Sequence, residues 1–155
     1  MLSVAEEVSD QHWQKSPGAD RWSAAEVFAH LLIIEERIIF GMKRLSRSAP
    51  VPVPLHKRFH LPLAMGTWRG RKLRTPIPLD AKRVCGKQES FANLTAAREI
   101  TLEFIESTRG TDVSPYRFDH PFLGSLNMYE WFRLVGYHEL RHAKQIRELV
   151  ETFHR

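Results

Sequence analysis

Apolar side chains recur every three or four positions in four stretches of this chain, the spacing that places them on one face of an α-helix. The stretches predict helices over about residues 2–14, 23–47, 88–107 and 127–153. The apolar stripe of the fourth helix includes two histidines, although solvated polar side chains are not expected there. This stripe consists of Met128, Trp131, Val135, His138, His142, Ile146, Leu149 and Phe153.

The second predicted helix has a defined start, because Ser23 and Glu26 form the sequence pattern of a capping box. Six of the nine prolines lie between residues 48 and 86, and proline blocks the interior of a helix. We expect this segment to cross the helices as a strap. The chain as a whole is predicted to be all-α, a four-helix bundle with a long proline-rich crossover between helices two and three.

Length and composition narrow the class of protein. The 155 residues are expected to form one domain, residues 1–155, and the share of hydrophobic residues, 43%, is ordinary for a soluble globular protein. No apolar run reaches the ~18 residues of a transmembrane helix, so no membrane association is expected. Cys85 is the one cysteine, which excludes an internal disulfide and favours a reducing, cytoplasmic location.

The positive charge is concentrated in one part of the strap. Between His56 and Lys87 there are nine Lys and Arg residues and a single acid, Asp80. A solvated basic flap is the simplest interpretation, and binding of an anionic small molecule is the next. Nucleic acid is the least favoured partner, because a proline-rich segment is a poor rigid platform for stacking bases. The residues proposed to hold an anionic thiol cofactor are Arg69, Arg71, Lys72 and Arg74.

The two histidines of the fourth helix belong to the sequence His138-Glu139-Leu140-Arg141-His142. Side chains four residues apart project from the same side of a helix, so both imidazoles can reach one metal ion. The five letters also spell HExxH, the motif of zinc proteases. Such a protease needs a third ligand downstream, but the position six past His142 is Glu148 and only thirteen residues remain. A third ligand is therefore expected from upstream.

His30 is the candidate for the third ligand, because it lies at the edge of the inward face of the second helix. If that helix neighbours the fourth, His30 can face His138 and His142. Three neutral imidazoles with open positions suit a divalent metal ion such as zinc, nickel or iron. The alternative is that each histidine is a buried, hydrogen-bonded structural residue. Burying two imidazoles without a partner is costly, which favours metal binding.

Two segments together carry a family resemblance, Trp22–Leu31 and His138–Ile146, with Phe122–Leu126 leading into the last helix. They resemble the DinB/YfiT-like family of metalloenzymes. The resemblance implies a four-helix bundle of up-down-down-up topology, with one metal held by three histidines at His30, His138 and His142. It also implies a fold similar to bacterial thiol-dependent transferases and isomerases, with some members described as metal-dependent hydrolases, and it makes a homodimer plausible.

Two hypotheses of different class follow. The first is a metal-dependent enzyme acting on a small-molecule substrate, either an S-transferase that uses a low-molecular-weight thiol or a hydrolase. The second is a non-catalytic bundle in which a structural metal or a histidine cluster supports a binding or interaction surface. Structural zinc sites are usually closed by four protein ligands, and the sequence offers no evident fourth. An open, catalytic site is therefore favoured, although no catalytic residue is identified.

Other polar residues are weaker candidates. Glu139 is rotated about 100° from His138 on the helix, so we expect a surface carboxylate and not a general base. Glu35 is expected to be an exposed helix charge, with orientation of a ligand as the alternative. Structural or solvent-exposed roles are favoured over roles in the site for six further residues, which are His12, His56, His60, Trp68, Cys85 and His120.

Overall fold

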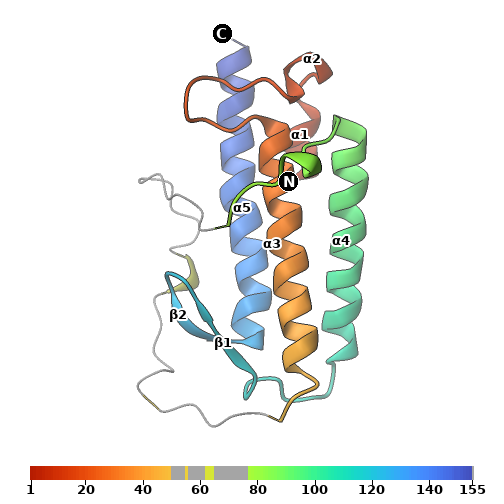
Figure 1. The fold of residues 1–155 in the computed structure, drawn as a ribbon, viewed down its shortest axis with the longest axis vertical. Helices are drawn as coiled ribbons and strands as arrows, with labels where there is room; N and C mark the ends of the chain where they lie inside the picture. The colour runs from red at the N-terminus through yellow and green to blue at the C-terminus, as the bar shows by residue number, and fades with distance from the viewer. Residues whose placement is uncertain (50–54, 56–61, 65–76, 155) are drawn as a thin grey trace.

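A computed structural model describes residues 1–49, 55, 62–64 and 77–154. Three long helices dominate it and lie side by side, with α3 between α4 and α5 (Figure 1). They are α3 (Ala24–Leu45), α4 (Lys87–Ser107) and α5 (Met128–Phe153). The smaller elements are α1 (Leu2–Glu6), α2 (Asp10–Trp13), the 3-10 helix η3 (Ala81–Arg83) and the strands β1 (Arg117–His120) and β2 (Gly124–Asn127).

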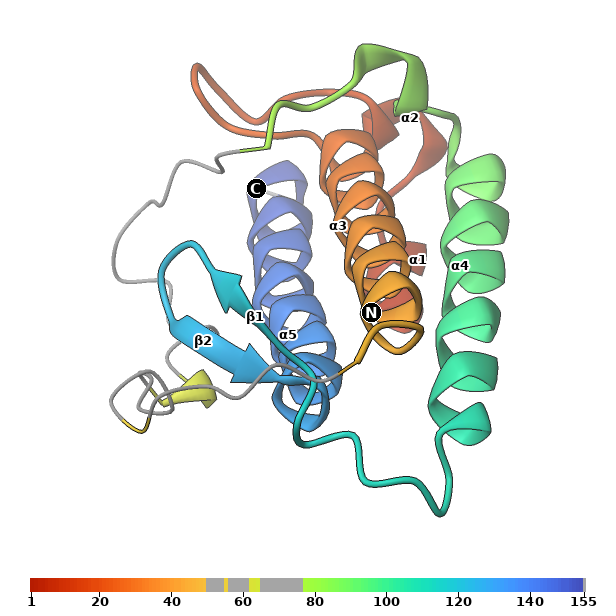
Figure 2. The same ribbon diagram turned by 60° about the horizontal axis from the view of Figure 1, so that its bottom comes forward.

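The long helices differ in direction. Figures 1 and 2 show α3 and α4 running the same way along the chain, while α5 returns in the opposite direction beside α3. Short α1 packs against α5, and α2 packs against α3. No helix in the described part of the chain combines the length and apolar character that a membrane span needs.

Side-chain caps determine where the two histidine-bearing helices begin. Ser23 precedes α3, and its hydroxyl accepts a hydrogen bond from the Glu26 amide while the Glu26 carboxylate accepts one from the Ser23 amide. Asn127 and Glu130 form the same reciprocal arrangement at the start of α5. Both capping boxes satisfy amide groups that have no partner within the helix. The predicted start of the second helix is confirmed.

The prediction of one continuous helix over residues 2–14 is wrong, because the backbone turns between α1 and α2. The Lys87 ammonium group donates hydrogen bonds to the carbonyls of Glu6 and Val8, at 2.9 and 2.7 Å. A continuous helix would need the Glu6 carbonyl for its own internal bonds. The break also allows both Val8 and Trp13 to be buried in the core.

A second correction is that the fold is not purely helical. Strands β1 and β2 form an antiparallel hairpin in which Arg117 pairs with Asn127 and His120 pairs with Gly124. The ring of Phe118 stacks on Trp131 of α5, with ring centroids 4.1 Å apart. No strand was predicted over this stretch, because strands of four residues around a proline give no clear period.

The apolar core is divided into two clusters, one toward each end of the long helices. The first contains Trp13, Phe28 and Ile146, and the second contains Met42, Leu126, Trp131 and others. Between the clusters, α3, α4 and α5 each turn polar residues toward one another. We call this region the polar layer, and it consists of His30, Glu35, Arg98, Thr101, His138, Glu139 and His142.

Most of the expected strap lies outside the described residues. This applies to His56, His60 and Trp68, and to the four basic residues proposed to bind an anionic thiol. Leu63 is described, and its side chain is buried in the second apolar cluster.

Candidate metal centre

Three histidines from two antiparallel helices converge in the polar layer. His30 comes from α3, and His138 and His142 come from successive turns of α5. The Nε2 atom of His138 lies 3.3 Å from Nε2 of His30 and 3.2 Å from Nε2 of His142. The predicted convergence of these three side chains is confirmed.

The spacing of the nitrogen atoms fits a tetrahedral ion. Bonds of about 2.0–2.1 Å from zinc to imidazole nitrogen place two ligand nitrogens roughly 3.3 Å apart in tetrahedral geometry. Hydrogen bonding alone does not account for the arrangement, because Nε2 of His138 contacts both neighbours and carries at most one proton. The three ligand atoms lie within 4.8 Å of one another, so one ion can contact all of them.

Burial keeps the three imidazoles neutral. His30 and His142 are only 5% and 6% exposed, and His138 is partly buried. Loss of hydration lowers the pKa of His30 to about 4. Burial and then the neighbouring His30 lower the pKa of His138 to about 3, and burial likewise places the pKa of His142 well below its ordinary value. At neutral pH all three rings therefore offer lone pairs, as metal ligands must.

Gln145 determines which nitrogen of His142 faces the cluster. Its side-chain oxygen lies 2.9 Å from Nδ1 of His142, and an amide oxygen can only accept a hydrogen bond. Nδ1 therefore carries the proton, and Nε2 presents its lone pair to the other histidines. Such a partner is typical of metal-binding histidines. This role of Gln145 was not predicted, although Gln145 follows His142 by three residues and so lies on a neighbouring turn.

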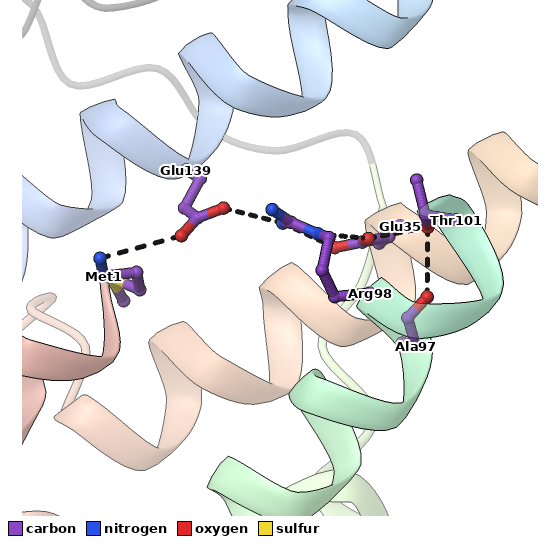
Figure 3. A network of polar contacts seen from close by, with 6 residues as sticks. All are labelled: Met1, Glu35, Ala97, Arg98, Thr101 and Glu139. Carbon is purple, nitrogen blue, oxygen red and sulfur yellow. Dashed lines mark hydrogen bonds and ion pairs between the residues drawn. The ribbon is translucent and has the colours of Figure 1, made fainter. Parts of the chain in front are cut away.

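The two carboxylates near the histidines are engaged in ion pairs (Figure 3). Glu35 was predicted to be exposed, and this is wrong, since its side chain is only 5% exposed and pairs with Arg98 at 2.8 Å. Glu139 points off the histidine seam as expected, but it is mostly covered. It contacts Arg98 at 2.6 Å and the amino group of Met1 at 3.7 Å. The hydrogen bonds from Arg98 to Glu35 raise the pKa of the guanidinium group further.

The remaining described candidates lie outside the histidine cluster. The ring of His12 stacks on Phe153 near the end of α5. Nδ1 of His120 accepts hydrogen bonds from the amides of Phe122 and Leu123, so the predicted structural role of this residue is confirmed. The carbonyl of Cys85 accepts a hydrogen bond from the Trp13 indole, and its thiol does not join the cluster.

Within the described residues, no fourth His, Cys, Asp or Glu completes the group. An ion held by three imidazoles would keep at least one position for an exogenous ligand. The donor set, the neutral state of the rings and the spacing of the nitrogens all fit a divalent transition metal.

Comparison with known proteins gives one family and one curated relative. The sequence model described as the DinB superfamily matches residues 1–146. The relative is the uncharacterized protein YuaE of Bacillus subtilis (strain 168), which is 28% identical over 150 residues, 96% of this chain and 89% of the relative. No solved structure matches the chain significantly.

The low pKa values predict that the metal-free protein loses stability in acid. The unfolded chain takes up protons on its histidines as the pH falls through about 6.5, whereas His30 in the folded state does not until about pH 4. Between pH 7 and pH 5 the free energy of unfolding should fall by about 2 kcal/mol from His30 alone. Urea denaturation of the chelator-treated protein at both pH values measures this loss.

His30→Leu removes the titrating ring and should show a smaller loss between the two pH values. His12→Leu is the matched control, because that ring lies outside the buried cluster. An equal loss of stability in His30→Leu and the wild type would contradict the assignment of a buried neutral imidazole.

Proposed function

The chain belongs to the DinB superfamily, and we propose that it is a metal-dependent enzyme whose His30, His138 and His142 bind one divalent ion, zinc, nickel or iron. The observation that carries this proposal is the meeting of three neutral Nε2 atoms at 3.2 and 3.3 Å inside a buried layer. An arrangement of neutral imidazoles, one of which donates its Nδ1–H to Gln145, has the properties of a prepared ligand set.

The favoured reaction is S-transfer from a low-molecular-weight thiol to a small electrophilic substrate. A divalent ion in this site would lower the pKa of a thiol or a water molecule that occupies its open position. The histidines contribute neutral donors and a largely water-excluded setting, in which electrostatic interactions are stronger than in solvent. The sulfur, its proton lost to solvent, would then form the new bond to carbon, and the leaving group would depart from that carbon with the electron pair of its bond.

The ion pairs of Glu139 favour thiol transfer over hydrolysis. In HExxH proteases the glutamate acts as general base toward the attacking water. Here the corresponding carboxylate pairs with Arg98 and with the amino group of Met1. A carboxylate that points off the histidine seam and contacts Arg98 is not positioned to take a proton from a water molecule at the histidines. A thiol is acidic enough to release its proton to solvent once a metal stabilises the sulfur, so S-transfer does not require that base.

The ligand assignment predicts metal stoichiometry. Elemental analysis of the purified wild type should find about one divalent ion per chain, as a single three-ligand site holds. His30→Ala and His142→Ala should each lose most of that metal, because a site with two imidazoles binds far more weakly. His12→Ala should keep the wild-type content, since its ring packs on Phe153 away from the cluster. Circular dichroism establishes that each variant is folded, and unchanged metal content in folded His30→Ala would contradict the assignment.

The proposed reaction predicts metal-dependent consumption of thiol. We expect the metal-loaded wild type to accelerate conjugation of a small thiol, such as 2-mercaptoethanol, to an activated aryl chloride. Removing the ion with a chelator or introducing His142→Ala should abolish the acceleration, because either change removes the group that stabilises the sulfur. Thiol loss and chloride release are measured together. Metal-dependent ester hydrolysis that needs no thiol would instead support a hydrolase and contradict the S-transferase proposal.

A further inference from the structure

Arg98 connects all three long helices through the polar layer (Figure 3). Its guanidinium group forms a two-pronged contact with Glu35 of α3, through Nε at 2.8 Å and Nη2 at 3.0 Å. The same Nη2 atom lies 2.6 Å from a carboxylate oxygen of Glu139 on α5. The Thr101 hydroxyl of α4 lies within hydrogen-bond distance of both Glu35 and the Ala97 carbonyl, and its proton serves one of them at a time.

Burial of this network is not explained by stability alone. Glu35 is 4% exposed, and the side chains of Arg98 and Glu139 are 32% and 24% exposed. Taking paired charges out of water costs about as much as their attraction returns, so apolar residues of similar volume are often at least as stabilising. Charged groups can fix the relative position of helices, because a guanidinium group donates paired hydrogen bonds to a carboxylate in only a few geometries.

The network links α3 and α5, the two helices whose relative position sets the separation of the histidines. Glu139 follows His138 directly, and Glu35 follows His30 by five residues, about 1.4 turns. Each carboxylate therefore belongs to a helix that carries part of the histidine cluster. Helix α4 contributes no histidine to that cluster, yet its Arg98 contacts both carboxylates. A shift of α3 against α5 would change the 3.3 Å separation between His30 and His138.

We propose that Arg98 is a positioning residue for the metal centre, holding Glu35 and Glu139 so that α3 and α5 present their histidines at metal-binding distance. This inference rests on the proposed function. Helix α4 would then contribute to metal affinity through Arg98, although it carries none of the three histidines.

The test compares zinc affinity in Arg98→Lys and in a matched control, Arg83→Lys. Arg83 of η3 makes the same kind of two-pronged contact, at 3.2 and 3.0 Å, with Glu36, the residue next to Glu35. That pair is exposed, at 45% and 43%, and neither partner lies in the polar layer. The dissociation constant is measured by competition with a chromophoric zinc chelator. We expect Arg98→Lys to weaken zinc binding about 10- to 100-fold, and Arg83→Lys to leave it unchanged.

A double variant separates positioning from general stabilisation. Glu35→Met with Arg98→Met replaces the buried pair by apolar side chains of similar length, and Thr101 keeps the Ala97 carbonyl as its acceptor. The urea midpoint of the metal-free double variant should lie close to that of the wild type. Its zinc affinity should nevertheless stay about 10-fold or more below the wild-type value.

Each outcome has a defined meaning. Wild-type zinc affinity in Arg98→Lys, or in a folded double variant, would overturn the positioning role while leaving the proposed function in place. Weakened binding in both of them, with Arg83→Lys unchanged, would support it. A wild type that binds neither zinc, nickel nor iron would overturn the proposed function itself, and with it this inference.

Discussion

The need to satisfy polar groups buried between two apolar clusters is the constraint on which this structure depends. Three helices each place polar side chains at the same level, where water is largely excluded. Unpaired polar groups are costly there, so each group needs a partner, and several of these partners lie on another helix. The histidines meet one another between α3 and α5, and Arg98 of α4 joins the two carboxylates. These contacts therefore fix the relative positions of the three helices at the level of the polar layer.

Within this layer the HExxH pattern has a meaning different from the one it has in a protease. The two histidines project toward His30, as ligands from one face of a helix should. The glutamate between them faces another direction and belongs to the ion-pair network. The five-letter motif thus has two roles on one helix: its histidines face the proposed metal, and its Glu139 contacts Met1 and Arg98. The third histidine comes from the other half of the chain, which makes the centre a link between distant segments.

The sequence could predict features that depend on neighbours within a few residues. The capping box at Ser23, the extents of the long helices and the common face of His138 and His142 are of this kind. His30 was also found, because the apolar spacing of α3 placed it on the inward edge. Features that depend on distant partners were missed. Glu35 is buried against Arg98, which lies 63 residues further along the chain, and Lys87 contacts the Glu6 and Val8 carbonyls where the predicted first helix is interrupted. Periodicity carries no signal for such contacts.

X-ray absorption spectroscopy of the metal-loaded wild type tests the central claim most directly, because it reports the atoms bound to the ion. With zinc bound, the account predicts three imidazole nitrogens at about 2.0–2.1 Å. Adding a small thiol should introduce one sulfur neighbour at about 2.3 Å. A sulfur neighbour in the absence of added thiol, or fewer than three imidazoles around the ion, would contradict the account.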